Sequence, residues 1–495
     1  METRLDRIDT PLVLPAHAGL FYGGGWHQPK RGGHFESRNP GTGEVLGRVA
    51  DGSPEDVDAA VLAARRGFAT WRDVHPAERA RIMRESAVVI RAHAAELAML
   101  DAADCGNPVR EMGRDALAAA DSFDLFAGLV TEMKGASIPM GKDAVNFSVR
   151  EPFGVVARIV AFNHPFMFVA AKAAAPLAAG NAVMIKPPEQ ASLSALRFAE
   201  LVGPLLPAGV LSVMTGGRTV GAALSAHRDI AMVTLIGSAA TGRAVMRGAS
   251  ETLKPVLLEL GGKNALIALA DADPDQVAAA AVAGMNFGWC GQSCGSTSRA
   301  FIHDAIYDAV IERIPRHVAQ FKPGLPTSWD TTMGALISAT QHEKVLNYIE
   351  IGKQEGARLL CGGARPDAPE LAHGFFVEPT VFCDVVQSMR IASEEIFGPV
   401  LSVLRWSDSE RMLDEVNRTE YGLTCSIWTG NLQAAHRTAQ AVQAGYIWVN
   451  EVGKHFPGAP FGGFKHSGIG REECLGELLA FTQEKNIHIN LRHRD

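Results

Sequence analysis

A cysteine in a glycine-rich segment is the first candidate for chemistry in this chain. Cys294 closely follows Cys290 in the sequence Asn286-Phe287-Gly288-Trp289-Cys290-Gly291-Gln292-Ser293-Cys294-Gly295. Such an irregular segment can expose a thiol and surround it with backbone N–H groups, which stabilise a thiolate or an oxyanion. Both cysteines could instead be buried as small hydrophobic residues. Since no further ligands lie at close spacing, we predict no metal site here.

An acid and an amide each follow an apolar run that is typical of a strand. Glu259 precedes a glycine pair in Leu258-Glu259-Leu260-Gly261-Gly262-Lys263-Asn264, and Asn163 stands in Phe162-Asn163-His164-Pro165. Glu259 could be a turn acid or a general base in a cleft. Asn163 could cap the following helix, or its amide could donate to a developing oxyanion. The residues alone leave these alternatives open.

The composition limits the class of protein. The chain has 495 residues, of which 47% are hydrophobic and 20% charged, and its formal net charge is -7. We expect about two to three domains with buried cores. Because there is no Lys/Arg block and no apolar run reaches the roughly 18 residues of a membrane helix, we expect no nucleic-acid or membrane partner. The charged N-terminus does not resemble a secretory signal, and the 7 widely spaced cysteines favour a reduced, cytoplasmic setting.

Short apolar runs alternate with Ala-rich helical stretches from residue 151 onward, which indicates a parallel α/β sheet. We expect strands at residues 155–161, 182–185, 210–214, 231–236 and 255–258, and helices at 166–179, 193–206 and 241–249. Further upstream, Ser53-Pro54 predicts a helix start and Asn107-Pro108 a break between helices. No Gly-x-Gly-x-x-Gly turn follows these strands and no P-loop is present. A dinucleotide on this sheet would therefore be held without the standard glycine turn.

Seven segments, in order from about residue 20 to 475, resemble the aldehyde dehydrogenase superfamily. The segments are Phe162-Asn163-His164-Pro165, Ile185-Lys186-Pro187-Pro188-Glu189, Gly237-Ser238-Ala239-Ala240-Thr241-Gly242, Glu259-Leu260-Gly261-Gly262-Lys263, Gly291-Gln292-Ser293-Cys294, Glu394-Glu395-Ile396-Phe397-Gly398-Pro399-Val400 and Pro460-Phe461-Gly462-Gly463-Phe464-Lys465. One such motif would carry little weight, but seven in order cover nearly the whole chain.

The resemblance implies an α/β fold with three parts. These are a Rossmann-like NAD-binding domain at residues 1–129 and 152–262, an α/β catalytic domain at 263–460, and an oligomerisation β-flap at 130–151 and 475–495. In the C-terminal strand around residues 486–490, Ile487, Ile489 and Leu491 alternate with polar residues, as in a half-buried strand. Added to a neighbour's sheet, the flap would give a homodimer or a dimer of dimers, a homotetramer.

The resemblance also implies the cofactor and its contacts. The pyrophosphate of NAD would lie at the Gly237-Ser238 turn, before a helix N-terminus. Lys186 and Glu189 would contact the adenosine ribose, while Glu395, Phe397 and Phe162 would lie near the nicotinamide end. A glutamate at position 189 would repel a 2'-phosphate, so we predict NAD rather than NADP. Phe162 stands where the family frequently has Trp, so an indole donor is missing there.

In the implied mechanism, Cys294 attacks the aldehyde carbon. The Asn163 amide and the backbone N–H of Cys294 hold the oxyanion, and hydride loss to NAD leaves a thioester. Glu259 then activates the water that hydrolyses it. The resemblance also places Lys172 among the catalytic residues. We expect a Cys294 thiol of low pKa that reacts quickly at neutral pH.

The implied aldehyde tunnel is lined by His164, Met167, Phe168, Ala171, Trp289, Ser293, Gly295, His455 and Phe461. This largely apolar and aromatic lining favours an aromatic or medium aliphatic aldehyde. A betaine aldehyde, to which Trp289 could offer a π-face, or a semialdehyde is the alternative. His164 stands where the family often has Phe, and we expect it to line the tunnel and not to act as a base.

Two other functions are disfavoured by Glu259. Relatives that transfer the acyl group to CoA lack a hydrolytic glutamate at this position. A catalytically silent structural relative would need neither Cys294 nor Glu259. Because both residues are present, hydrolysis of a thioester by water is the preferred prediction.

Overall fold

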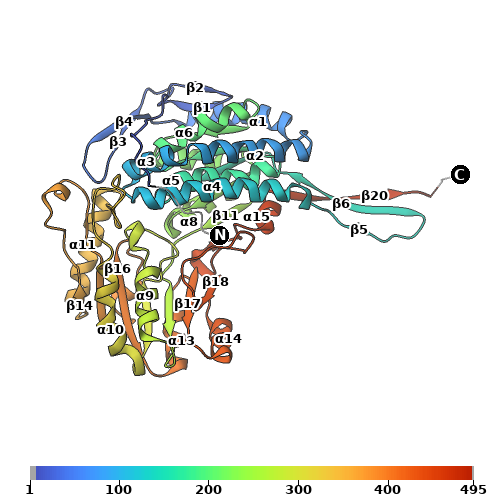
Figure 1. Ribbon diagram of the computed structural model, residues 1–495. Helices are drawn as coiled ribbons and strands as arrows, with labels where there is room; N and C mark the ends of the chain where they lie inside the picture. The colour runs from blue at the N-terminus through green and yellow to red at the C-terminus, as the bar shows by residue number, and fades with distance from the viewer. Residues whose placement is uncertain (1–6, 493–495) are drawn as a thin grey trace.

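Two sheets, one above the other in Figure 1, organise the computed structural model. The structure describes residues 7–492. The first six residues of the expected cofactor domain, with most of the charged N-terminus, lie outside the described residues, as do the last three residues of the expected flap. The α/β class predicted from the alternation of strands and helices is confirmed.

The upper sheet has the order β19-β11-β10-β7-β8-β9-β1-β2. From β11 to β9 neighbouring strands are parallel, and the strands at both edges are antiparallel. The strands are β1 (Leu20–Tyr22), β2 (Gly25–His27), β7 (Val155–Ile159), β8 (Ala182–Lys186), β9 (Leu211–Val213), β10 (Met232–Ile236), β11 (Val256–Glu259) and β19 (Gly468–Ile469). All five strands expected from the apolar runs are present, with ends shifted by one or two residues.

Helices cover both faces of this sheet, which is why its parallel strands are apolar throughout. Val156 and Ile185 pack into the core on one face, whereas Ala157 and Met184 pack into the core on the other. The first face carries α2 (Pro76–Ala92), α3 (Ala94–Cys105), α4 (Val109–Leu129), α5 (Pro165–Ala178) and α6 (Leu193–Val202), and the second carries α1 (Pro54–Trp71), α7 (Arg218–Ala226) and α8 (Ala239–Ser250). The predicted start of α1 and the break between α3 and α4 are confirmed; α7 was not predicted.

The lower sheet has the order β14-β15-β16-β13-β12-β17-β18, and only β14 is antiparallel to its neighbour among the described strands. Its strands are β12 (Ala265–Ala268), β13 (Arg299–His303), β14 (Arg358–Cys361), β15 (Thr380–Val385), β16 (Val400–Trp406), β17 (Thr424–Trp428) and β18 (Tyr446–Val449). The accompanying helices are α9 (Pro274–Gly284), α10 (Asp304–Val318), α11 (Ala339–Gln354), α12 (Arg390–Ser393), α13 (Ser409–Asn417) and α14 (Leu432–Ala441). A second apolar core fills this half.

The remaining elements are short. A separate hairpin is formed by β3 (His34–Arg38) and β4 (Val45–Ala50). Single 3₁₀ turns are η1 (Val130–Glu132), η2 (Gly203–Leu205), η3 (Phe287–Trp289), η4 (Pro369–Leu371) and η5 (Lys465–Ser467).

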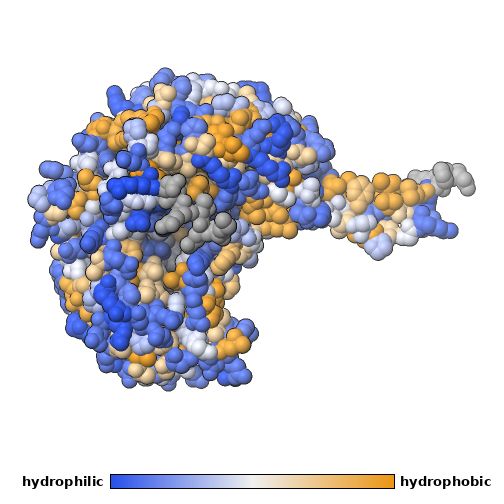
Figure 2. Space-filling model, in the orientation of Figure 1, coloured by the Kyte–Doolittle hydropathy of each residue, from blue (hydrophilic) through white to orange (hydrophobic). Residues whose placement is uncertain are grey.

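A three-stranded antiparallel arm projects from the body of the molecule (Figure 1). It consists of β5 (Ser137–Ile138), β6 (Ala144–Pro152) and β20 (Thr482–Asn490). Apolar side chains lie open along it, as Figure 2 shows, with Ile489 43% and Leu491 50% exposed. The expected C-terminal strand is present as β20, and its apolar side chains are uncovered in the single chain, so their burial against a neighbouring copy stays a prediction. Residues 475–480, expected in the flap, instead form helix α15 (Leu475–Ala480), which packs on α5.

A buried amide ties the end of α5 to the root of this arm. Asn181 accepts a hydrogen bond from Gly154 N (3.0 Å) and donates to Phe481 O (3.0 Å) and Pro176 O (3.2 Å). Asn181→Ala removes the side-chain partners of Gly154 N and Phe481 O, whereas Pro176 O keeps its bond from the Asn181 backbone N–H, so we expect the free energy of unfolding to fall by about 3 kcal/mol. Urea unfolding followed by tryptophan fluorescence measures it. The exposed helix variant Gln433→Ala is the control, expected within about 0.5 kcal/mol of the parent; equal midpoints for both variants would refute this role.

Candidate active site

The polar residues predicted from the strand ends lie along one edge of the upper sheet. Asn163 follows β7, Lys186 ends β8, Ser238 follows β10 and Glu259 ends β11. These four strands are parallel neighbours, so their carboxyl ends meet at the same edge. Segments separated by almost 100 residues of sequence are thereby brought together.

A short crossover at residues 260–264 joins the upper sheet to the lower one and holds the Cys294 loop. Asn264, directly before β12, donates from Nδ2 to the backbone oxygens of Cys294 (2.6 Å) and Ser296 (3.0 Å). Its Oδ1 accepts a hydrogen bond from Thr424 N (3.0 Å). Asn264 is part of a motif quoted from the sequence, but its positioning role was not predicted.

A cavity of about 530 Å³ opens where the Cys294 loop meets the end of β11. Cys294 and Glu259 both line it, and the Cys294 thiol is hydrogen-bonded to the Glu259 carboxyl group. The carboxyl group is buried, and its Oε1 has no hydrogen-bond partner among the described residues. A potential nucleophile and a potential base therefore face each other in one pocket, and Glu259 is not a surface turn acid.

Burial changes the protonation of both groups. It raises the pKa of Glu259 to about 8, with a further contribution from the nearby Glu472 carboxylate. Burial and the Glu259 carboxylate raise the pKa of the Cys294 thiol well above its usual range. The expected low-pKa thiol is therefore wrong for this arrangement, because a carboxylate beside the sulfur opposes a second negative charge.

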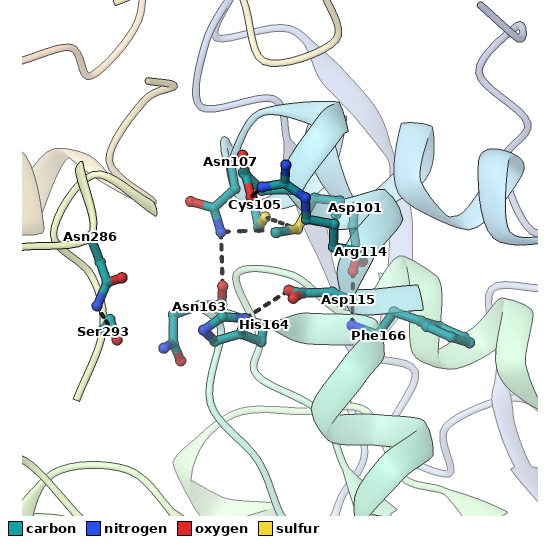
Figure 3. A network of polar contacts seen from close by, with 12 residues as sticks. Asp101, Cys105, Asn107, Arg114, Asp115, Asn163, His164, Phe166, Asn286 and Ser293 are labelled. Carbon is teal, nitrogen blue, oxygen red and sulfur yellow. Dashed lines mark hydrogen bonds and ion pairs between the residues drawn. The ribbon is translucent and has the colours of Figure 1, made fainter. Parts of the chain in front are cut away.

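Asn163 is held by its backbone and keeps its amide available. Asn107 Nδ2 donates to the Asn163 carbonyl at 2.8 Å, as Figure 3 shows, and the Asn163 side chain points away from this contact. That side chain is buried and makes no hydrogen bond to any described residue. It does not cap α5, since the residue before the helix is His164, which makes no capping bond either. The alternative of Asn163 as a helix cap is wrong.

Lys172, on α5, belongs to a buried ionic network that the sequence did not reveal. Its Nζ lies 2.9 Å from Glu472, which also pairs with Arg158 at 3.1 Å. Burial alone would lower the pKa of Lys172, but the carboxylates of Glu472, Glu477 and Glu473 raise it above its ordinary value. Lys172 therefore stays charged and holds Glu472 at the cavity wall. Glu472 and Glu473 belong to none of the seven segments that resemble the family, and no local sequence pattern connects them to α5.

The predicted cofactor residues divide into three places along the sheet edge. Ser238 caps α8 by accepting a hydrogen bond from Thr241 N (3.2 Å), and Lys186 Nζ lies 3.4 Å from Glu189. Glu395 Oε1 accepts from Gly262 N (2.9 Å).

Phe162 and Phe397 come from different sheets and meet edge to face, with centroids 5.8 Å apart. None of the predicted cofactor residues lines the cavity that contains Cys294, so this cavity is separate from the predicted cofactor contacts.

The residues expected in the aldehyde tunnel are brought together around that cavity. All nine line it, including Met167, Phe168, Trp289 and Phe461. Two features were not predicted: His164 Nδ1 lies 2.7 Å from Asp115, and His455 Nδ1 lies 2.9 Å from Glu473. Asp115 could have been noticed, because it is one of two acids, with Glu111, on the mostly apolar, buried face of an Ala-rich helix.

Two negative findings concern the described residues. Within residues 7–492, no cluster of three or more His, Cys, Asp or Glu side chains has the arrangement of a metal site. No helix in the same range combines the length and the apolar character that crossing a membrane requires.

Comparisons with known proteins agree with this geometry. The model of the aldehyde dehydrogenase family matches residues 26–487. Aldehyde dehydrogenase tropH of Talaromyces stipitatus is 51% identical over 486 residues, covering 97% of this chain and 94% of that protein. The chain therefore belongs to the aldehyde dehydrogenase family. It is an aldehyde dehydrogenase, an oxidoreductase that acts on the aldehyde group of its substrate.

Solved structures of relatives share the fold over nearly the whole chain. The aldehyde dehydrogenase of Bacillus cereus, solved as an NAD+ complex, has a TM-score of 0.93 and 39% identity, covering 96% of this chain and 97% of that one. The indole-3-acetaldehyde dehydrogenase AldA of P. syringae, solved as a mutant with NAD+ and IAA, has a TM-score of 0.94 and 36% identity, covering 97% of each chain.

The raised pKa of Cys294 makes a measurable prediction. At pH 7 iodoacetamide should alkylate Cys294 more slowly than a free cysteine, because little thiolate is present. Above pH 8, where the Glu259 carboxyl group is ionised, Glu259→Gln should accelerate alkylation about tenfold by removing the opposing charge. Glu395→Gln, which removes a weaker opposing charge, is the matched control and should accelerate it less. Peptide mass spectrometry follows each cysteine separately; wild-type alkylation faster than that of free cysteine would contradict the assignment.

Proposed function

We propose that the protein oxidises an aldehyde to a carboxylic acid with NAD, through a thioester on Cys294. The observation that supports this most directly is the Cys294 thiol against the buried carboxyl group of Glu259 in one cavity. A nucleophile beside a base, with an available amide at Asn163 nearby on the sheet edge, is the donor set that acyl transfer through sulfur needs.

The residues along the sheet edge fit NAD. The α8 N-terminus at Ser238 is exposed and offers backbone N–H groups to a pyrophosphate. Glu189 carries a half-exposed carboxylate that accepts hydrogen bonds from ribose hydroxyls and repels a 2'-phosphate, which favours NAD over NADP. Glu395 and Phe397 would hold the nicotinamide ribose and ring. When bound, NAD supplies the acceptor for the hydride that leaves the substrate carbon.

The position of Glu395 depends on a glycine at residue 261. A Cβ at Gly261 would lie 2.3 Å from Glu395 Oε2, so only glycine admits the carboxylate there. With its Oε1 held by Gly262 N, Glu395 keeps an acceptor at the cofactor edge of the site.

The protein's own groups carry the remaining steps. The thiol proton must be removed as sulfur bonds to the aldehyde carbon, and Glu259 is the carboxylate in contact with it. The Asn163 amide and the Cys294 N–H would donate to the oxyanion, each contributing about 3 kcal/mol to the transition state. After the thioester has formed and Glu259 has passed the thiol proton to solvent, Glu259 takes a proton from the water that attacks the acyl carbon. The carbon–sulfur bond then breaks, the Cys294 sulfur is the leaving group, and the carboxylic acid is released.

The lining of the cavity favours an aromatic or medium aliphatic aldehyde. Phe168, Trp289, Trp448 and Phe461 contribute aromatic surface. The P. syringae relative is named for indole-3-acetaldehyde, which has an aromatic ring. A betaine aldehyde or a semialdehyde is the second candidate, and acyl transfer to CoA is disfavoured by the base at Glu259.

Oligomeric state and location are parts of the same proposal. We propose that the projecting arm adds its strands to a neighbouring copy, giving a dimer or a dimer of dimers, because its apolar residues such as Ile489 and Leu491 are otherwise open to solvent. All seven cysteines are free thiols, which favours a reducing compartment such as the cytoplasm.

Cys294→Ala tests the nucleophile. It should lower NADH formation from benzaldehyde or hexanal by roughly 10⁴-fold or more, because no other thiol lines the cavity among the described residues. NAD binding measured by calorimetry should be retained. The control is Cys290→Ala, whose buried sulfur faces Ala335 O and not the cavity. Retained turnover in Cys294→Ala would exclude the thioester.

Glu259→Gln tests the base. A single burst of NADH should be followed by slow turnover, with an acyl adduct on Cys294 detected by intact mass. In the parent, hydrolysis requires ionised Glu259, so the steady-state rate should rise with pH through about 8. The variant should lose this rise. An unchanged steady-state rate with no trapped adduct would argue against Glu259 as the base.

A further inference from the structure

Two histidines face the cavity, and a carboxylate binds each one. His164 Nδ1 lies 2.7 Å from Asp115 on α4, and His455 Nδ1 lies 2.9 Å from Glu473. The His164 side chain is 16% exposed and that of His455 41%, so the first lies deeper in the cavity and the second nearer its mouth. Figure 3 shows the His164 ring between Asp115 and the segment that carries Asn286 and Ser293, both of which line the same cavity.

The carboxylates determine which ring nitrogen is free. An ionised carboxylate only accepts hydrogen bonds, so a ring nitrogen that is bonded to it carries the proton. Burial would raise the pKa of Glu473, but the hydrogen bond from His455, the charge that His455 carries when protonated and the charge of Lys172 lower it, so Glu473 is ionised at neutral pH. In a neutral imidazole with Nδ1 protonated, Nε2 has a lone pair and accepts hydrogen bonds. Neither Nε2 has a hydrogen-bond partner among residues 7–492.

Aromatic neighbours hold both rings in place. His164 packs against Phe168 (centroid distance 5.1 Å) and Trp289 (5.5 Å). His455 packs against Phe461 (4.5 Å) and stacks with Tyr446 (5.9 Å). The two acceptor atoms are therefore set into walls that suit a flat apolar ring.

The charges of the cavity oppose an anionic substrate. Six carboxylate side chains line it, namely Asp115, Asp121, Glu259, Glu472, Glu473 and Glu477. The lysine among the lining residues, Lys172, is already bound to Glu472 at 2.9 Å. A carboxylate on the substrate would be repelled by these acidic side chains, and the described lining residues offer no free cation to compensate its charge.

A cationic substrate would find most of these carboxylates already paired, and the unpaired one among the described residues, Glu259, is largely protonated at neutral pH because burial raises its pKa to about 8. Asp115 and Glu473 are bound to the two histidines, and Asp121 is paired with Arg91 at 2.6 Å. A neutral group that donates a hydrogen bond suits the two Nε2 atoms better than either charge does.

We propose that His164 and His455 are substrate-binding residues that select an aromatic aldehyde bearing ring hydroxyl groups, each hydroxyl donating to an Nε2 atom. The inference rests on the proposed function, since it assumes that the aldehyde reaches Cys294 through this cavity. The apolar walls bind the ring, and the histidines distinguish a ring that carries hydroxyls from one that does not.

Matched aldehydes test the selection. The wild-type kcat/KM should be higher for 4-hydroxybenzaldehyde and 3,4-dihydroxybenzaldehyde than for benzaldehyde, 4-methoxybenzaldehyde and 4-carboxybenzaldehyde. The methoxy compound keeps the oxygen but cannot donate, and the carboxy compound tests the anionic alternative. Equal values across the set, or a preference for the carboxy compound, would overturn the proposal.

Histidine variants test the residues. His164→Phe and His455→Phe keep an aromatic ring, and each should lower the ratio of kcat/KM for the hydroxylated over the methoxylated aldehyde about fivefold to tenfold, mainly through KM. His164→Phe leaves Asp115 without its partner. If this destabilises the single variant, the double variant His164→Phe/Asp115→Asn replaces it in the test. His317→Phe is the matched control, since His317 lies 2.9 Å from Asp275 but does not line the cavity. An equal loss for both aldehydes would overturn the proposal.

Binding separates this inference from the proposed function. In Cys294→Ala with NAD, calorimetry should show tighter binding of 4-hydroxybenzaldehyde than of the methoxy compound, and the histidine variants should remove the difference. If the wild type oxidised no aldehyde but this preference persisted, the proposed function would fail and the binding site would stand. If no preference appeared in Cys294→Ala, the proposal about the histidines would be wrong, whatever the turnover.

Discussion

The crossover at residues 260–264 is the constraint on which the site depends. It leaves the upper sheet directly after Glu259 and enters the lower sheet directly after Asn264, whose side chain binds the backbone of Cys294 at 2.6 Å. Only this segment separates Glu259 from Asn264, the residue that holds the Cys294 loop. The two sheets therefore cannot shift relative to each other without separating the Cys294 thiol from the Glu259 carboxyl group. Gly261 within it leaves room for the Glu395 carboxyl group, so a residue from the lower half of the molecule reaches the same place.

Burial at this junction has an electrostatic consequence. The carboxyl group of Glu259 lies in the cavity wall without a cation in contact, which raises its pKa to about 8 and opposes ionisation of Cys294. Farther along the wall, Lys172 and Arg158 compensate Glu472 instead. The charges are thus distributed so that structural carboxylates are paired and the proposed base is not, which keeps Glu259 able to take up and release a proton near neutral pH.

Much of the fold could be predicted from local patterns. Apolar runs indicated every parallel strand from β7 to β11 within one or two residues, because strands buried on both faces must be apolar throughout. Helix α7 was missed since it is short, contains Gly221 and has only two large apolar residues, Val220 and Leu224. Alternation correctly indicated the strand β20 with one apolar face, but it could not indicate what covers that face.

The sequence by itself determined the chemistry that is available: a cysteine among glycines, an acid and an amide at strand ends, and the order of motifs that identifies the family. Tertiary structure alone decided how those groups behave. The high pKa of Cys294 arises from burial and from a carboxylate that lies 35 positions earlier in the chain. The pairs His164–Asp115 and His455–Glu473 join residues 49 and 18 positions apart. Burial and through-space charge are properties of folded neighbours, so no local pattern of residues contains them.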